Sequence, residues 1–225
     1  MTERLAEGVW RLEVGGVSVW NVNAYLVDDG GALTLVDAGT PFYRDTLSEA
    51  VAAAGHELAD VERVLLTHYD LDHFGGLLRG NGLDATVYAG GVDADLLAGD
   101  HSPPLLHHKG AFHRAVAAVL DDREVVRVED GDAIGGFTAY HTPGHNPGHM
   151  AYHHPDHDAA FLGDLVWERD GALTTPIRLD SYDLAELRES VVDLVDRLPP
   201  FALACMGHGT PLTTGGSDRL RELAD

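Results

Sequence analysis

The segment THYDLDHFGG, residues 67–76, constrains the fold of this chain more than any other stretch. It places His68, Asp70, Asp72 and His73 within six positions, directly after the apolar run VERVLL and before a Gly-Gly pair. A short apolar run of this kind predicts a buried strand, so the polar side chains would lie at the carboxyl end of that strand. Imidazoles and carboxylates this close together are typical of a metal site.

The same arrangement recurs along the chain. His145 lies in TPGHNPGH, Asp164 ends the run AAFLGD, and His208 lies in ACMGHG, in each case beside glycines that let the backbone approach closely. Nitrogen and oxygen ligands without a thiolate suit Zn²⁺, Fe or Mn²⁺. The set is too large for one tetrahedral ion and fits two divalent ions that share a carboxylate. The candidate metal ligands are His68, Asp70, Asp72, His73, His145, Asp164 and His208.

The charge of the chain excludes some partners. Acidic residues number 37 against 15 Lys and Arg, which gives a net charge of −22, and Lys109 is the only lysine. A nucleic-acid partner is not expected, because little positive charge is present to replace phosphate counterions. An Asp-rich, lysine-poor surface resembles proteins of halophiles that accumulate salt, where high salt screens the self-repulsion. An acidic protein of a mesophile is the alternative, and retention of secondary structure after desalting would favour it.

Composition also limits the class of protein. With 44% hydrophobic residues the 225-residue chain can bury an ordinary core, and we expect one domain over residues 1–225. The charged start MTERLAEGVW and the lack of a long apolar run predict a cytoplasmic protein without a membrane partner. Cys205, the only cysteine, lies in an apolar run and is interpreted as a structural thiol. A small molecule is the expected substrate, and the sequence sets no oligomeric state.

Local patterns predict more strands than helices. The first forty residues indicate strands, a helix is expected from Pro41 to about Ala54, and a second helix from Asp183 to Leu198. Residues 150–164 predict a hairpin with its turn at 155–158, which would leave His153, His154 and His157 at the surface. Residues 99–120 are interpreted as a loop or lid that leads into a helix, and residues 99–115 as a wall of the pocket. The histidines of this segment are expected in solvent, namely His101, His107, His108 and His113.

Five motifs occur in a family-specific order, namely VDAGT, THYDLDHFGG, TPGHNPGH, FLGD and GHG. In these motifs the chain resembles the metallo-beta-lactamase superfamily over nearly its whole length. The resemblance implies an α+β fold, the αβ/βα four-layer sandwich, with a dinuclear site. It implies that His68, Asp70 and His145 hold one ion, that Asp72, His73 and His208 hold the other, and that Asp164 bridges them. Asp37 would support the ligands without binding metal.

Asp70 departs from the family pattern. The usual motif is H-x-H-x-D-H, and Asp70 stands where the middle histidine is expected. The flavodiiron branch of the superfamily has a glutamate there and binds iron. An added carboxylate makes the cluster of two divalent ions and their ligands neutral, and a neutral cluster favours harder ions. Zinc is the first choice of metal, and iron or manganese is the alternative. Asp70 could instead hydrogen-bond a ligand imidazole without binding metal.

These residues predict a metallohydrolase of a small ester, thioester or lactone. A metal-bound hydroxide would attack the acyl carbon, and Asp72 would also orient the nucleophile and pass its proton to the leaving group. Tyr69 either points its hydroxyl at the substrate or packs internally, and His149 either lines the pocket or supports the fold. The alternatives are an iron-dependent oxidoreductase, similar to flavodiiron or persulfide-oxidising enzymes, and a metal-poor binding or structural protein.

Overall fold

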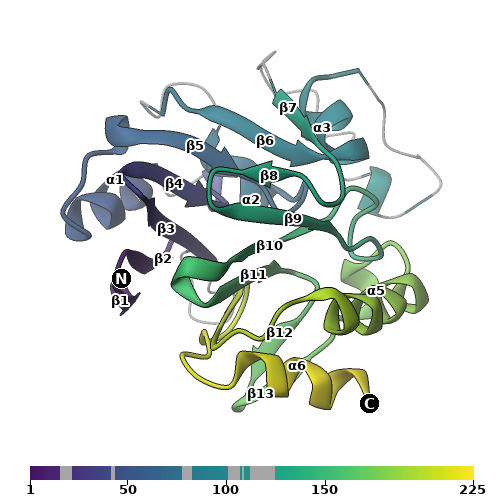
Figure 1. Cartoon of the computed structure of the whole chain (residues 1–225). Coiled ribbons are helices and arrows are strands. Elements are labelled where there is room, and N and C mark those ends of the chain that lie inside the picture. Colours follow the sequence, from purple (N-terminus) through teal and green to yellow (C-terminus); the bar gives the residue numbers. More distant parts are fainter. Residues whose placement is uncertain (16–21, 42–43, 78–82, 101–106, 108, 112–124) are drawn as a thin grey trace.

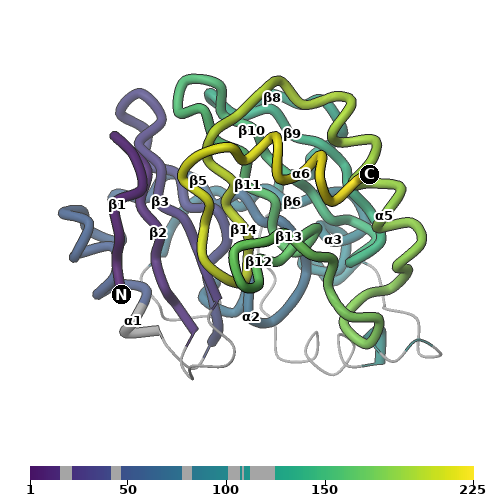
Figure 2. Tube along the Cα trace, turned by 90° about the horizontal axis from the view of Figure 1, so that it is seen from below, coloured from purple at the N-terminus to yellow at the C-terminus, as the bar shows by residue number. Residues whose placement is uncertain are grey.

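Two β-sheets pack face to face, and helices cover the outer face of each sheet (Figure 1). The computed structural model describes residues 1–15, 22–41, 44–77, 83–100, 107, 109–111 and 125–225. After a quarter turn, the N-terminal strands and the C-terminal helices lie on opposite sides of the molecule (Figure 2). Most of the expected lid, including His101, His108 and His113, lies outside the described residues.

The first sheet follows the order of the chain. Its first four strands pair antiparallel, and the remaining ones pair parallel to their neighbours. The seven described strands are β1 (Thr2–Ala6), β2 (Val9–Glu13), β3 (Asn23–Asp29), β4 (Ala32–Val36), β5 (Val61–Leu65), β6 (Thr86–Gly90) and β7 (Val125–Val128). The helical segments associated with this sheet are α1 (Arg44–Ala53), η2 (Leu58–Asp60), α2 (Leu71–Phe74), η3 (Gly75–Leu77) and α3 (Gly91–Leu97).

The second sheet has the order β14-β11-β10-β9-β8, and only β11 and β14 pair parallel. Its described strands are β8 (Ala133–Ile134), β9 (Phe137–His141), β10 (Met150–His154), β11 (Ala159–Gly163) and β14 (Leu203–Met206). The other elements of this half are η4 (Pro155–His157), the ribbon β12 (Trp167–Arg169) and β13 (Ala172–Thr174), η5 (Arg178–Asp180), α5 (Leu184–Arg197) and α6 (Gly216–Ala224).

Strand alternation explains the layers. In β3, Leu26 belongs to the core between the first sheet and its helices, whereas Val27 belongs to the core between the two sheets. In β11, Phe161 faces the same inter-sheet core, whereas Leu162 packs toward the core that contains α5 residues such as Leu187. Because neighbouring residues of a strand point to opposite faces, each sheet is covered on both sides. The expected four-layer α+β sandwich is therefore confirmed.

Helix α5 also positions part of the site. The side chain of Asp183 accepts hydrogen bonds from the backbone N–H groups of Ala185 and Glu186, an N-cap that stabilises a helix by about 1 kcal/mol. The backbone N–H of Asp183 donates to the carbonyl of Gly144 at 2.8 Å. The start of α5 is thereby fixed against the loop that carries His145.

Some expectations about local structure were wrong. The hairpin turn at 155–158 is present as η4, but His153 and His154 are only 3% and 2% exposed. Strand β10 continues through His154, whose Nε2 lies 3.1 Å from Asp29 Oδ1, so both histidines lie in packed layers. The ribbon of β12 and β13 and the helix α6 were not predicted, because their segments are short or carry few apolar side chains. No helix among the described residues is long and apolar enough to cross a membrane.

Candidate metal centre

Four segments bring the candidate ligands together. His68 follows β5, His145 lies in the loop after β9, Asp164 follows β11 directly, and His208 follows β14. The loops of the two sheets are joined where the N–H of Met150 donates to the carbonyl of Thr67 at 2.7 Å. Because loops at the ends of packed strands are held by a rigid scaffold, side chains distant in sequence can converge there.

Asp72, His73 and His208 form one group of potential ligands, called here the second half-site. His73 and Asp72 lie on the short helix α2, and the Nε2 atoms of His73 and His208 lie 4.0 and 3.5 Å from Asp72 Oδ2. Gly207 is required beside this group, because a Cβ atom there would meet His73 and Asp164. The carboxylate of Asp72 is the most solvent-accessible of the three, with 38% of its side chain exposed.

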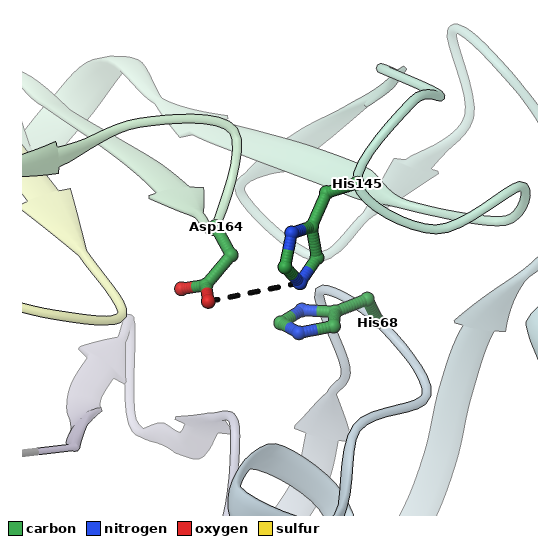
Figure 3. Close-up of side chains that lie close together, drawn as sticks. All are labelled: His68, His145 and Asp164. Carbon is green, nitrogen blue, oxygen red and sulfur yellow. Dashed lines mark ion pairs between the residues drawn. The ribbon is translucent and has the colours of Figure 1, made fainter. Parts of the chain in front are cut away.

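His68, His145 and Asp164 form the other group, called here the first half-site. Figure 3 shows the three side chains turned toward a common centre, with His145 Nε2 at 3.7 Å from Asp164 Oδ2. Asp164 also reaches the second half-site, since its oxygens lie 3.6 Å from His73 Nε2 and 3.2 Å from His208 Nε2. Its carboxylate therefore lies between the two groups, as a bridging ligand would.

Buried ligand atoms at this centre fit a metal ion. His73 Nε2 and Asp164 Oδ1 are buried and have no hydrogen-bond partner among the described residues. A buried polar atom without a partner is costly, so two of them beside each other indicate a bound ion. Imidazole nitrogens and carboxylate oxygens suit zinc, iron and manganese. Such an ion would be held by the second half-site together with Asp164.

Asp37 contacts the second half-site through His73. Its Oδ2 lies 2.8 Å from His73 Nδ1, and the backbone N–H and hydroxyl of Thr67 both donate to its carboxylate at 2.8 Å. The backbone of Asp37 has φ +59°, a region that Asp and Asn tolerate better than other residues with side chains. A hydrogen bond at Nδ1 fixes the ring and leaves Nε2 of His73 for a metal ion.

A second supporting carboxylate, Asp93, was not predicted. It is fully buried on α3, where its Oδ2 accepts from the N–H of Tyr69 at 2.8 Å and its Oδ1 from the N–H of Gly148 at 2.9 Å. It therefore connects the loop of His68 to the loop of His145. Nothing in the segment GVDADLL distinguishes this aspartate from an acid in the first turn of a surface helix.

His149 and Tyr69 have different roles in the structure. His149 pairs through Nδ1 with the hydroxyl of Thr142 at 2.8 Å, and its Nε2 accepts from the backbone N–H of Asp164 at 3.2 Å. It thus holds the segment that presents Asp164. Tyr69 is fully buried, and its ring stacks on Phe74 with centroids 4.7 Å apart, so its ring packs in the core.

Charges in the second half-site favour a cation. Burial lowers the pKa of His73, but Asp164, Asp37 and Asp72 outweigh burial and raise it to about 9. Burial likewise lowers the pKa of His208, and Asp164 and Asp72 again outweigh it, so that pKa is raised. In the same way, the imidazoles outweigh burial at Asp72 and lower its pKa. The carboxylate of Asp72 therefore stays ionised in this half-site.

The first half-site has a different electrostatic character. Burial, and after it the charge of His73, lowers the pKa of His68 well below its usual value. The Nζ atom of Lys109 lies 2.9 Å from His145 Nε2 and 2.7 Å from Asp70 Oδ2. Asp70 Oδ2 in turn lies 3.3 Å from His68 Nε2 and 3.0 Å from His145 Nε2. A positively charged side chain thus contacts this half-site directly.

Asp70 and Lys109 lie next to each other at the first half-site. Asp70 is in neither group of potential ligands, and its Oδ2 lies 3.0 Å from Nε2 of His145, which is a potential ligand. Its Oδ1 also accepts from Asn146 Nδ2 at 3.1 Å. Lys109 was not predicted at the site. The one sequence feature that could have drawn attention to Lys109 is that it is the only lysine in a chain of net charge −22.

A pocket of about 640 Å³ lies beside the loop of His145. Tyr182 lines it, donates its backbone N–H to the carbonyl of His145, and stacks its ring on His107 with centroids 4.3 Å apart. Arg178, Asp183 and Arg188 also line it. Of the histidines expected in the solvent-exposed lid, His107 therefore contributes to a packed pocket wall.

Comparison with known proteins agrees with this fold. The sequence profile described as metallo-beta-lactamase superfamily matches residues 17–208. A probable metallo-hydrolase of Bacillus subtilis, YybB, is 28% identical over 84% of this chain and 80% of its own length. A hydroxyacylglutathione hydrolase of Fuscovulum blasticum is 33% identical over 82% of this chain and 61% of its own length. TTHA1623, solved in a di-iron-bound form, is 28% identical with a TM-score of 0.66, covering 92% of this chain and 96% of that one.

Proposed function

Because the chain belongs to the metallo-beta-lactamase superfamily, we propose that it is a metal-dependent hydrolase of a small thioester, ester or lactone. The observation that carries the proposal is the pair of adjacent ligand groups, in which buried His73 Nε2 and Asp164 Oδ1 have no hydrogen-bond partner among the described residues. A metal-poor binding protein would have no need for such atoms, which are costly to bury without an ion.

A thioester is the first substrate class to test. Hydroxyacylglutathione is a thioester, and the relative of that name is 33% identical to this chain. The pocket beside His145 has Arg178 and Arg188 on its wall, and these guanidinium groups would suit an anionic group on the substrate. In a chain with so few basic residues, two arginines on one wall support an acidic leaving group or acyl tail.

When bound, a divalent ion supplies Lewis acidity and lowers the pKa of water so that it can act as a nucleophile. The residues of this chain do the remaining work. Asp72 is exposed enough to meet substrate, and its lowered pKa keeps the carboxylate ionised and able to accept a proton and pass it to the leaving group. Asp37 fixes the ring of His73, and His149 holds the backbone of Asp164.

The metal we propose is zinc, with iron as the main competitor and manganese as a further possibility. The di-iron form of TTHA1623 supports iron, and with it an iron-dependent oxidoreductase as the second candidate function. Metal analysis of protein purified without a chelating tag separates the two. Zinc without oxygen consumption supports hydrolysis, whereas iron with oxygen uptake on a thiol or persulfide substrate supports the oxidoreductase.

The direct test is turnover of acyl substrates by metal-loaded protein. A panel of a hydroxyacyl thioester of glutathione, an aryl ester and a lactone is assayed with the wild type, with Asp72→Asn and with Asp218→Asn as a matched control. Asp218 is 82% exposed on α6 and pairs with Arg221, far from the ligands in sequence and element. We expect the control to keep full turnover and Asp72→Asn to lose it. Metal-loaded wild type without turnover of any acyl substrate would contradict the proposal.

The acidic composition supports the proposal that the protein works in a medium of high salt. A net charge of −22 repels itself in dilute buffer, and at molar salt the Debye length falls to about 3 Å. Far-UV circular dichroism during stepwise desalting tests whether the protein comes from a halophile. Loss of secondary structure supports a halophile, and an unchanged spectrum in dilute buffer contradicts it.

A further inference from the structure

Lys109 is buried inside the first half-site. Its side chain is only 6% exposed, although lysine is otherwise missing from this acidic chain. Its Nζ lies 2.7 Å from Asp70 Oδ2 and 2.9 Å from His145 Nε2, and it donates to the carbonyl of Asp180 at 2.7 Å. Because an ammonium group has three N–H donors, these three acceptors satisfy it completely.

The pairing explains why an acid stands at position 70. A buried ammonium group is tolerated when a carboxylate pairs with it and the remaining donors find acceptors. Asp70 supplies that carboxylate, and Asn146 fixes its other oxygen at 3.1 Å. A histidine at position 70 would leave Lys109 without its negative partner. Asp70 and Lys109 therefore belong together as one ion pair.

The position of Lys109 conflicts with a metal ion in the same half-site. His145 Nε2, one of the potential ligand atoms there, already faces the ammonium group at 2.9 Å. An imidazole nitrogen has a single lone pair, so it cannot accept from Lys109 and bind an ion at the same time. An ammonium group and a divalent ion at one ligand would also repel each other strongly.

We propose that Lys109 acts as an internal cation that takes the place of the first metal ion. The protein then binds one divalent ion tightly, through Asp72, His73 and His208 with Asp164. A second ion binds weakly, because Lys109 must leave His145 and Asp70 before that ion can enter. The inference rests on the metal binding in the proposed function, but it replaces the expected pair of equal ions with one ion and one lysine.

The test counts zinc in the full-length protein after dialysis, by inductively coupled plasma mass spectrometry. We expect one zinc per chain in the wild type and two in Lys109→Met, because the neutral side chain releases His145 as a ligand beside His68 and Asp164. Lys109→Gln, which can still hydrogen-bond Asp70, serves as a second neutral variant if the methionine variant does not fold. Arg63→Met is the matched control, since it removes a cation paired with Asp29 away from the ligands, and it should keep one zinc.

Calorimetric titration with zinc gives an independent readout. The second equivalent should bind at least about tenfold more tightly to the neutral variants than to the wild type, because a like charge has been removed from the half-site. Two tight ions in the wild type, or an unchanged count in both neutral variants, would overturn the inference and leave the proposed function standing. A wild type that retains no zinc or iron at all would contradict the proposed function as well.

Discussion

The second half-site and the first half-site present the same kinds of ligand atom, but different groups support them. In the second, Asp37 contacts His73 Nδ1 at 2.8 Å, and the carboxylates raise the pKa of His73 to about 9. In the first, His68 Nδ1 lies 2.9 Å from the hydroxyl of Thr67, and Lys109 already contacts His145. Chemically similar ligands can therefore differ in affinity through their neighbours, since the surrounding charge sets how strongly a cation is attracted.

The largest expected difference between the two half-sites, in metal content and in turnover, comes from the substitution of one aspartate in each. Asp72→Asn should remove the tight ion and abolish turnover, a loss well beyond the roughly 10–100-fold cost of removing a supporting group. Asp70→Asn should keep the tight ion, because Asp70 belongs to neither ligand group. Metal counts and kcat/KM of both variants are measured side by side. An Asp70→Asn protein without metal would break the comparison.

Asp37→Asn should have the next largest effect. Asparagine tolerates the φ of +59° at this position, so the fold is kept while the charge that anchors His73 is lost. We expect zinc affinity at the second half-site to fall by about 10–100-fold. Competition with a chromogenic chelator measures this, and the melting temperature of the metal-free protein controls for the fold. Unchanged affinity would show that Asp37 does not support the ligand.

Thr67→Val should act on both halves weakly. The hydroxyl donates to Asp37 Oδ2 and contacts His68 Nδ1, and valine has nearly the same shape. Loss of these hydrogen bonds should reduce the free energy of unfolding by about 1 kcal/mol and change zinc affinity less than Asp37→Asn does. Chemical denaturation and zinc titration check the two effects. A fall in affinity equal to that of Asp37→Asn would remove the distinction between carboxylate and hydroxyl support.

Asp29 provides a reference ion pair outside both halves. Burial raises its pKa, but the N–H of Gly136 and the side chains of His154 and Arg63 outweigh burial and lower it. Because the folded pKa lies below the unfolded value of about 3.9, the stabilisation is present above that pH and is lost as the pH falls through the folded pKa.

The corresponding variant, Asp29→Asn, should have the smallest effect. It should lower the free energy of unfolding at pH 7 by less than about 1 kcal/mol, with no difference from wild type in strong acid. Denaturation curves at several pH values, combined with a zinc count, measure this. A changed zinc count would show that charges distant from the half-sites also affect how much metal they bind.

Part of this structure could be predicted from local sequence, because strands and caps are local. The run before His68, the turn at 155–158 and the capping Asp183 follow from alternation and turn chemistry. The ribbon β12–β13 and α6 could not be found in this way, because three-residue strands and a helix with few apolar residues carry a weak periodic signal. His154 was placed wrongly because its burial depends on Asp29, far away in the chain.

The ligands were easier to predict than the groups around them. His68, His145 and His208 each end or follow an apolar run, so the sequence marks them. Lys109 reaches Asp70 only through the tertiary packing of a segment that has no strand pattern, and Asp93 joins two loops from a helix. Contacts of this kind are set by where elements pack against one another, which periodicity does not encode.

The central claim is that the two half-sites differ in their affinity for metal. Anomalous scattering at the zinc edge, from crystals grown with one equivalent of zinc, tests it most directly. We predict a single peak bounded by Asp72, His73 and His208, with Lys109 still paired to Asp70. Two peaks of equal height, or a single peak between His68 and His145, would contradict this account.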